Sequence, residues 1–241
     1  MRLSYSAIST YQKCPLSYKF MYVDKLRIKR TPALSFGTSV HAALERFYDV
    51  SAPEPPTESE LMDHLTGSWE RDGYESTEQE QEYLEKGKTV LAAFYQANVS
   101  DFRVPAAIEQ SFTVTVGNHT VRGIIDRLDR LTSGGYEVID YKTGAKPPPQ
   151  SVIDRDLQLS IYDLAANELW DVEPAKLSLY YVVPGTKLST TRDPGDRDRT
   201  RDLINEVASE IGRDLRSGRF KPKKNRLCAW CDFRDPCPLF R

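Results

Sequence analysis

The spacing of hydrophobic residues predicts a helical first half of the chain. The expected helices cover residues 4–26, 36–48 and 58–97. The first should break near Cys14, which proline follows. In the second, Val40, Leu44 and Phe47 recur at the three- and four-residue spacing of one helix face. The third carries many glutamates, so its polar face should point to solvent and away from any polyanion.

After residue 104 the pattern changes from helical spacing to alternation. The expected strands cover residues 108–116, 120–131 and 136–141, and we expect them to form an antiparallel meander. Two glycines mark the turn between the last two strands. A helix at 153–170, an apolar strand at 177–183 and a final helix at 197–217 should follow.

These elements predict an α/β fold with a central mixed sheet flanked by helices, in a single domain. Its expected parts are N-terminal helices at 1–50, an acidic helical insertion at 51–104, a core at 105–217 and a basic, cysteine-rich segment at 218–241. The chain has no GxxxxGK[ST] phosphate-binding loop, which argues against an ATP-driven motor.

Composition and charge narrow the function classes only slightly. The 241 residues are 39% hydrophobic and include 13 tyrosines, which is enough for a real core and excludes global disorder. The formal net charge of −2 gives no hint of a nucleic-acid or membrane partner. No stretch approaches the roughly 18 apolar residues of a membrane-spanning helix. With no apolar run at the N-terminus, we expect a cytoplasmic protein without a membrane partner.

The four cysteines are the most informative residues. Cys228 and Cys231 form a CxxC pair, Cys237 follows closely, and Cys14 stands near the start of the chain. Three thiolates in one short loop suit a single metal centre, with Cys14 as the fourth ligand. Such a centre would join the N- and C-terminal segments. Because cytoplasmic thiols stay reduced, a metal is favoured over two disulfides, and the spacing alone slightly favours structural Zn²⁺.

A second set of candidate residues lies in the expected meander. Asp140 and Lys142 are two apart and should project from one face of their strand, while Tyr141 points to the other face. If the two strands pair through the glycine turn, Asp126 lies beside Asp140. Asp129, three positions from Asp126, should face the opposite way. Paired carboxylates suit Mg²⁺ or Mn²⁺, and a lysine on the same face can act on a water or on phosphoryl charge.

Three further residues could complete such a site. His41 lies in an expected helix, and Gln158 and Tyr162 are four apart, so they share one face of another helix. Each motif is weak when it stands alone. An aspartate on a hairpin is more often a solvated turn residue, and a helical histidine is more often a core or surface residue.

Taken in order, these motifs resemble the RecB-type branch of the PD-(D/E)xK nucleases. The resemblance rests on GTSVHAALE around His41, GIIDRLD around Asp126, VIDYKTG around Asp140, and QLSIY from Gln158 to Tyr162. The cysteines and the opening ISTYQKCP resemble its iron–sulfur subgroup, which includes the AddB nuclease domain and the CRISPR-associated adaptation nuclease. Ile125 stands where the family pattern has proline, and Asp140 stands where glutamate is commoner.

The resemblance implies a restriction-endonuclease-like core and a metal-dependent deoxyribonuclease. His41, Asp126, Asp140 and the Tyr141 carbonyl would bind Mg²⁺ or Mn²⁺. Lys142 would position the attacking water. Gln158 and Tyr162 would support the active site and the DNA strand. The four cysteines would hold a [4Fe–4S] cluster in place of zinc. An exonuclease acting on single-stranded or frayed ends is expected, in DNA repair, CRISPR adaptation or phage DNA processing.

Two other classes of protein remain open from the sequence. One is a non-catalytic subunit that binds DNA ends within a helicase complex, and the other is a zinc-stapled nucleic-acid-binding protein. A separate helicase or CRISPR adaptation protein could be the partner of the nuclease itself.

Local charge gives a further hypothesis about DNA binding. A cysteine-bound centre would bring together two basic runs, Lys25, Arg27, Lys29 and Arg30 in one and Arg216, Arg219, Lys221, Lys223, Lys224 and Arg226 in the other. We expect these runs to guide a DNA strand, with Trp230 and Phe233 available for base stacking.

Overall fold

The computed structural model describes residues 1–240, which form two compact units. Among the described residues, one unit comprises residues 1–29, 112–123 and 193–240, and the other comprises residues 30–111 and 124–192. Strands β2 (Ala107–Val116) and β3 (His119–Arg130) contribute residues to both. We describe each unit by itself.

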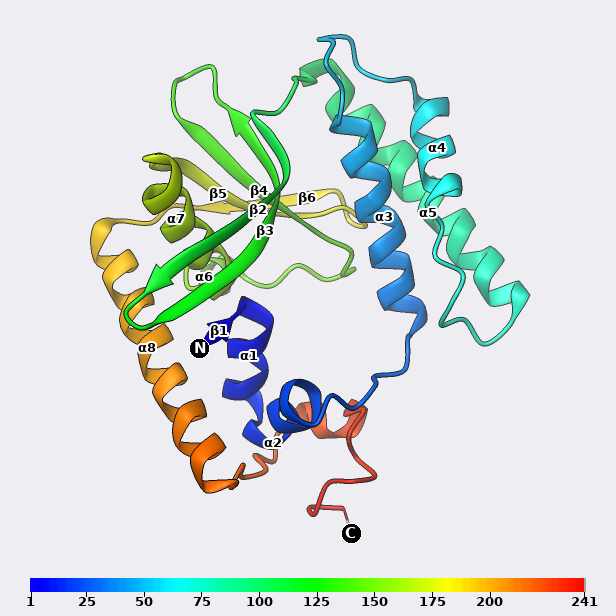
Figure 1. Ribbon diagram of the computed structural model, residues 1–241. Helices are drawn as coiled ribbons and strands as arrows, with labels where there is room; N and C mark the ends of the chain where they lie inside the picture. Colours follow the sequence, from blue (N-terminus) through cyan, green and yellow to red (C-terminus); the bar gives the residue numbers. More distant parts are fainter. Residues whose placement is uncertain (241) are drawn as a thin grey trace. The chain divides into compact units, whose positions relative to one another are not determined.

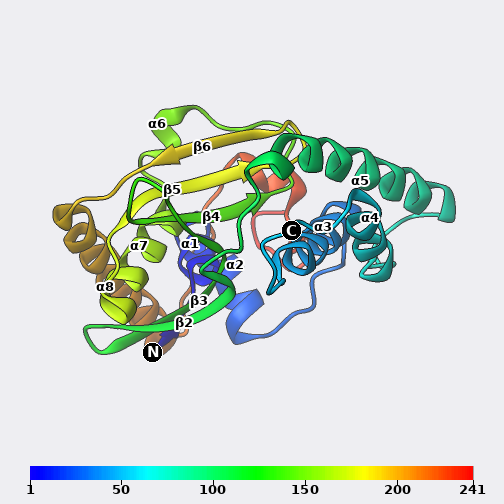
Figure 2. The same cartoon turned by 90° about the horizontal axis from the view of Figure 1, so that it is seen from above.

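The larger unit contains most of a mixed β-sheet. Strand β3 pairs antiparallel with β4 (Tyr136–Lys142), β4 pairs parallel with β5 (Pro174–Tyr181), and β5 pairs antiparallel with β6 (Thr186–Thr190). Figure 2 shows β4, β5 and β6 side by side in this order. The central strand β4 is buried over Glu137–Tyr141, because it has a hydrogen-bonded neighbour on each side and side chains packed on both faces.

Helices cover both faces of this sheet. On one face, Ile139 and Tyr141 of β4 join a hydrophobic core with three helices that lie side by side in Figure 1. These are α3 (Pro32–Tyr48), α4 (Glu58–Gly67) and α5 (Thr77–Asn98), and the short turn η2 (Val99–Asp101) follows them. On the other face, α7 (Leu157–Trp170) contacts Asp140, and the short helix α6 (Gln150–Ile153) precedes it.

The smaller unit brings the two ends of the chain together. Strand β1 (Arg2–Leu3) pairs parallel with β3. The elements that follow are α1 (Tyr5–Lys13), α2 (Pro15–Tyr18) and the π-helical turn η1 (Lys19–Val23), and the C-terminal part adds α8 (Pro194–Ser217) and η3 (Arg226–Trp230). Figure 1 shows the C-terminal segment beside α2. Asn225 Nδ2 donates to the Lys13 carbonyl at 3.0 Å, and Lys223 Nζ donates to the Gln12 carbonyl at 3.0 Å.

The structure confirms the α/β class and most of the expected elements, with three differences. The expected acidic helix is two helices, α4 and α5. The expected helix at 153–170 begins instead at Leu157, where Asp156 caps it by accepting from Leu159 N at 2.9 Å, and the short helix α6 ends at Ile153. Strands β1 and β6 were not predicted. No helix of the described residues is long and apolar enough to cross a membrane.

Candidate functional site

Asp126 and Asp140 lie on neighbouring strands at the same level of the sheet, as predicted. The antiparallel register pairs Arg127 with Ile139, and one further step along both strands reaches Asp126 and Asp140. Asp126 Oδ2 accepts a hydrogen bond from the Tyr141 backbone N–H at 2.8 Å. The Tyr141 side chain points into the core on the opposite face from Asp140, as the alternation of a strand requires.

His41 reaches this pair of strands from α3. Its Nδ1 lies 3.4 Å from Asp126 Oδ2, and its ring meets the Tyr141 ring edge-on at 6.2 Å. One turn earlier, Gly37 lies so close to the residue after β4 that an added Cβ would be 3.2 Å from Thr143 Oγ1. The missing side chain thus allows the start of α3 to approach the end of β4 closely, which brings His41 to the carboxylates.

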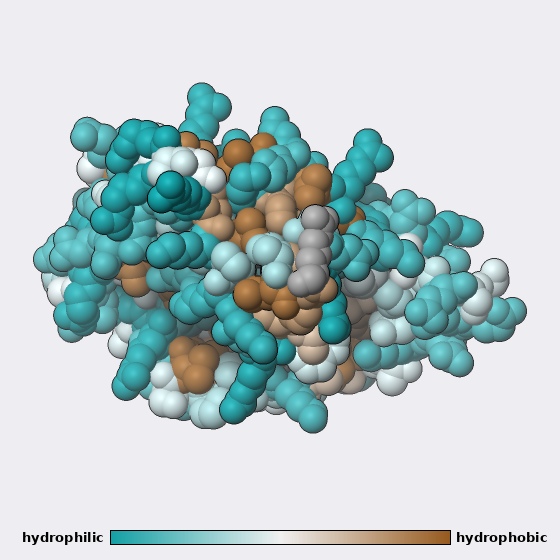
Figure 3. Space-filling view, turned by 90° about the horizontal axis from the view of Figure 1, so that it is seen from below, coloured by the Kyte–Doolittle hydropathy of each residue, from teal (hydrophilic) through white to brown (hydrophobic). Residues whose placement is uncertain are grey.

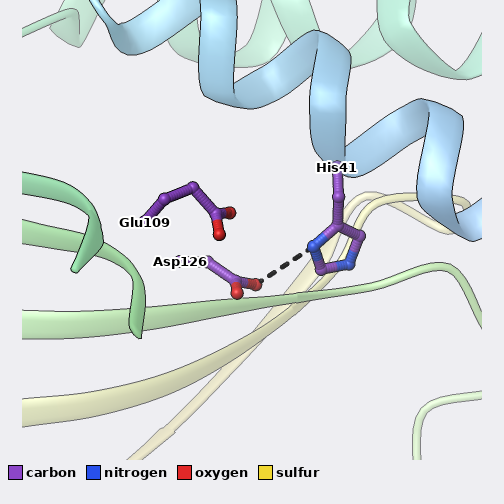
Figure 4. Close-up of side chains that lie close together, drawn as sticks. All are labelled: His41, Glu109 and Asp126. Atoms are coloured by element: carbon purple, nitrogen blue, oxygen red, sulfur yellow. Dashed lines mark ion pairs between the residues drawn. The ribbon is translucent and has the colours of Figure 1, made fainter. Parts of the chain in front are cut away.

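Glu109 on β2 is a member of this group that the sequence analysis missed. Figure 4 shows its carboxylate beside Asp126 and His41. One ligand atom from each of the three residues lies within 4.8 Å of the other two. The Glu109 backbone has a φ of 44°, in the left-handed region that non-glycine residues rarely adopt. The residue that supplies this carboxylate therefore has a strained backbone, a feature that is common at functional sites.

Lys142, Gln158 and Tyr162 form a hydrogen-bonded network around Asp140. Gln158 Oε1 accepts from Lys142 Nζ at 2.8 Å, while Gln158 Nε2 lies 2.8 Å from Asp140 Oδ1. Tyr162 OH donates to the same Oδ1 at 3.0 Å. The Lys142 ammonium is in contact with Asp140 Oδ2, which is buried. One oxygen of Asp140 is therefore held by α7, and the other faces the lysine.

Carboxylate charge is concentrated in this site. Burial, and then the charges of Asp126, Glu45 and Asp140, raise the pKa of Glu109 to about 7. Burial and the neighbouring Asp140 also raise the pKa of Asp126, although His41 opposes this shift. Burial acts to lower the pKa of Lys142, but attraction to Asp140 outweighs it and the pKa is raised. The lysine is therefore a cation at neutral pH.

The donor set fits a hard divalent cation. Carboxylate oxygens are preferred by Mg²⁺ and Mn²⁺, and Mn²⁺ also accepts an imidazole nitrogen. The close carboxylates of Glu109 and Asp126 and the raised pKa values of both residues are features that a bound cation would compensate. Glu109 and Asp126 form one tight group with His41, and Asp140 lies outside that group, on the adjoining strand.

Asp129 has a different role from Asp126. Its carboxylate binds the Arg127 guanidinium through two hydrogen bonds, of 2.6 and 2.5 Å. Arg127 is buried, stacks over the Tyr48 ring at 3.7 Å and donates to Tyr141 OH at 3.2 Å. As expected, the two aspartates of this strand face opposite ways, and Asp129 belongs to a structural ion pair.

The smaller unit places all four cysteines around one cavity of about 190 Å³. Two of the sulfur atoms accept backbone hydrogen bonds, Cys14 Sγ from Lys223 N at 3.4 Å and Cys228 Sγ from Asn225 N at 3.3 Å. Among the described residues, which include the four cysteines, no three sulfur atoms lie within 4.8 Å of one another. All four thiols are free.

The structure corrects two parts of the hypothesis about DNA binding. Phe233 is buried and packs against Phe20 at 5.5 Å, so it is not available to stack on a base. Arg30 is ion-paired with Glu70, so its charge is partly neutralised within the larger unit. Trp230, in contrast, is exposed.

The chain is similar along its length to two phage proteins. It is 26% identical to the Gene 69 protein of Mycobacterium phage L5, covering 99% of this chain and 96% of the relative. It is 28% identical to the Gene 69 protein of Mycobacterium phage D29, covering 99% and 97%. The fold is shared with a solved structure from Eubacterium rectale described as a candidate exonuclease, with a TM-score of 0.55, 8% identity, and 95% of this chain and 86% of that one covered.

The family itself follows from a match over nearly the whole chain. The model of the PD-(D/E)XK nuclease superfamily matches residues 2–238. The site contains the acidic residues and the lysine after which the PD-(D/E)XK superfamily is named, and they occur in the expected order. Asp126 lies on one strand, and Asp140 and Lys142 lie on the next. The chain belongs to the PD-(D/E)XK nuclease superfamily.

Proposed function

We propose that this protein is a metal-dependent deoxyribonuclease that hydrolyses phosphodiester bonds at single-stranded or frayed DNA ends. The observation that carries the proposal is the ion pair of Lys142 with Asp140, which Gln158 and Tyr162 hold by hydrogen bonds. This ion pair lies beside the group formed by His41, Glu109 and Asp126. A structural ion pair alone would have no need of three further metal-ligating side chains next to it.

His41, Asp126, Asp140 and the Tyr141 carbonyl would hold the cation, and Glu109 is positioned to join them. When bound, the cation supplies positive charge to the phosphate and lowers the pKa of a water molecule. The protein's own residues orient the reactants. Lys142, kept protonated by Asp140, can hold the attacking water and stabilise negative charge on a phosphoryl oxygen. Gln158 fixes the distance between Lys142 and Asp140, because it hydrogen-bonds to both.

The mode of cleavage can be tested by comparing linear and circular DNA. With Mg²⁺ or Mn²⁺ present, we expect linear single-stranded DNA to be degraded from its ends while circular single-stranded DNA of the same sequence persists. Cleavage of both would make the protein an endonuclease. Folded protein that binds ends tightly but cleaves neither would support the non-catalytic end-binding subunit.

We further propose that the four cysteines hold a [4Fe–4S] cluster. A tetrahedral zinc site with Zn–S bonds of about 2.3 Å brings its sulfur atoms to about 3.8 Å from one another. In a [4Fe–4S] cluster each thiolate binds a different iron, so the sulfur atoms stand farther apart than around one zinc ion. The resemblance of the cysteine motifs to the iron–sulfur subgroup favours the cluster over zinc. Backbone N–H groups directed at Cys14 and Cys228 would stabilise the thiolates.

Metal analysis of anaerobically purified protein separates the two centres. A [4Fe–4S] cluster predicts brown protein with about four iron and four sulfide per chain. Colourless protein with one zinc per chain would contradict the cluster and support the zinc-stapled alternative.

The two relatives from Mycobacterium phages favour phage DNA processing among the three pathways considered. A separate helicase partner is also part of this proposal.

A further inference from the structure

We propose that Trp230 is a base-stacking platform that lets the smaller unit recognise unpaired nucleotides of single-stranded DNA. This inference rests on the proposed nuclease function and names how the substrate strand is held. Trp230 is 80% exposed, although a large aromatic ring is normally at least partly covered. Its neighbours Leu227 and Phe240 are also exposed, and Figure 3 shows hydrophobic residues among hydrophilic ones on the face that carries the C-terminal segment.

The turn that carries Trp230 is held in place by the chain itself. Trp230 ends the turn η3, which Asn225 caps by accepting from Leu227 N at 2.8 Å. The other end of the Asn225 side chain donates to the Lys13 carbonyl of α1 at 3.0 Å. Cys228 and Cys231, on either side of Trp230 in the sequence, line the cysteine cavity together with the tryptophan. An exposed ring on a fixed turn loses little conformational freedom when a ligand stacks on it.

The charge next to the ring indicates what that ligand is. The segment that leads into η3 carries five basic residues and no acidic one over residues 219–226, namely Arg219, Lys221, Lys223, Lys224 and Arg226, and all five are exposed. Lys223 lines the same cavity as Trp230, and with Arg219 and Lys221 it also lines the groove between α1 and α8. The groove is also lined by three acidic residues, Glu206, Glu210 and Asp214. Of these, Glu210 lies 3.6 Å from Arg213, and Asp214 accepts a hydrogen bond from Tyr11 OH at 2.8 Å.

A basic segment that ends at an exposed aromatic ring is the combination that binds a single strand. The cations contact the phosphates, and a base stacks on the ring without regard to sequence, because every base has an aromatic face. A base in a duplex is already stacked and paired, so the platform should select unpaired nucleotides. The basic segment makes nucleic acid a better occupant of this exposed patch than an apolar protein surface.

The test separates base stacking from attraction to phosphate. Binding is measured by fluorescence anisotropy in EDTA, so that no cleavage occurs, with an oligothymidine of about 20 nucleotides, which exceeds the length of a typical single-strand site. The second ligand is a DNA strand of the same length in which the nucleotides lack their bases. We expect the wild-type protein to bind the oligothymidine about tenfold more tightly than the abasic strand. Trp230→Ala should lose most of this difference, and Trp230→Phe should keep most of it.

Leu215→Ala is the matched control, because it removes another exposed apolar side chain of the same unit, 45% exposed on α8. It should bind both strands as the wild-type protein does. The proposal is overturned if Trp230→Ala keeps the full preference for the oligothymidine over the abasic strand. A protein partner would then be the better candidate for contacting the exposed ring. If the wild-type protein binds neither strand, the platform proposal is overturned, and cleavage of DNA with Mg²⁺ then decides the nuclease proposal separately. Base-dependent binding by a wild-type protein that cleaves no DNA would overturn the nuclease proposal alone.

Discussion

At the scale of single residues, the site separates two carboxylates that the sequence presents as equivalent. Asp126 contacts His41 and the Tyr141 backbone, whereas Asp140 is bound by Gln158, Tyr162 and Lys142. The first therefore lies in a group of metal-ligating side chains with His41 and Glu109. The second is buried, and its geometry depends on α7. The same residue type thus acts in two different environments, which are set by the strand position and the facing helix.

Lys142→Ala should separate metal binding from catalysis. The variant removes the ammonium that we expect to orient the water, but it leaves His41, Glu109, Asp126 and Asp140 in place. We predict a loss of cleavage rate of about 10²- to 10³-fold, typical of removing one group that stabilises transition-state charge. Mn²⁺ affinity measured by calorimetry should stay the same or increase, because a competing cation has been removed. A large loss of Mn²⁺ affinity would show that Lys142 organises the metal site instead.

Glu109 shows why part of the site could not be found from the sequence. In an alternating strand, a glutamate among polar residues has the pattern of a solvated face, and nothing nearby marks it as different. What distinguishes it is a backbone φ of 44° and its closeness to Asp126, on the next strand of the sheet. Both depend on three-dimensional structure. By contrast, the roles of His41, Gln158 and Tyr162 were suggested by the order of the motifs.

At the scale of elements, α3 and β3 are joined by a buried arginine. Arg127 of β3 binds Asp129 and stacks over Tyr48 of α3. Because Asp126 is on the same strand and His41 is on the same helix, this contact also fixes the backbone from which both candidate ligands project. The core that surrounds it includes the neighbouring Tyr141.

Asp129→Ala should therefore destabilise the fold. It leaves the Arg127 charge buried and without its carboxylate partner, a change that typically costs about 3–5 kcal/mol in the free energy of unfolding. Asp198→Ala is the control, since its pair with Arg201 at 2.9 Å is exposed and should contribute less than about 1 kcal/mol. The measurement is the midpoint of chemical denaturation. Equal midpoints for the two variants would contradict a structural role for the Arg127–Asp129 pair.

The hydrophobic pattern located long elements well and short ones poorly. Helix α3 and strands β2, β3 and β4 repeat their apolar residues over many positions, so their type and approximate limits could be predicted. Strand β6 reads TKLST and has a single apolar residue, and it forms because β5 offers a free edge to pair with. The break between α6 and α7 depends on Asp156, whose capping role is visible only once the helix start is known.

At the scale of the whole molecule, the cysteine site connects the beginning and the end of the chain within the smaller unit. Cys14 follows α1, and the other three cysteines belong to the last part of the sequence. A centre bound by all four would close a loop of almost the whole chain in the unfolded state. Because this closure lowers the entropy of the unfolded chain, it stabilises the folded protein.

Cys14→Ala should thus give unstable and colourless protein. The loss of one ligand removes the connection to the N-terminal segment, and the remaining three cysteines lie in one short stretch. Visible absorbance, iron content and the melting temperature measure the effect, with Ser6→Ala on α1 as a control that lies outside the cysteine cavity and keeps all four thiols. Protein with wild-type yield, stability and activity would contradict the idea that the centre holds the chain ends together.

The basic segment should determine the salt dependence of DNA binding. Replacing Lys221, Lys223 and Lys224 by glutamine removes up to three phosphate contacts. For single strands, each contact contributes about 0.7 to the slope of log K against log salt concentration, so the slope should fall by about 2. Replacing three lysines of the larger unit that are exposed or partly exposed, Lys86, Lys88 and Lys176, should leave the slope nearly unchanged. An unchanged slope in the first variant would exclude the segment from the DNA-binding surface.

The degradation of end-labelled single-stranded DNA tests most directly whether the site around Asp140 is a nuclease active site. The assay uses anaerobically purified wild-type protein and the Asp140→Ala variant, with Asp198→Ala as a control. We predict release of label that requires Mg²⁺ or Mn²⁺, is abolished in Asp140→Ala and is retained in Asp198→Ala. Equal release by the wild-type protein and Asp140→Ala would contradict the assigned site. No release by folded wild-type protein would contradict the assignment of catalytic activity to this chain acting alone.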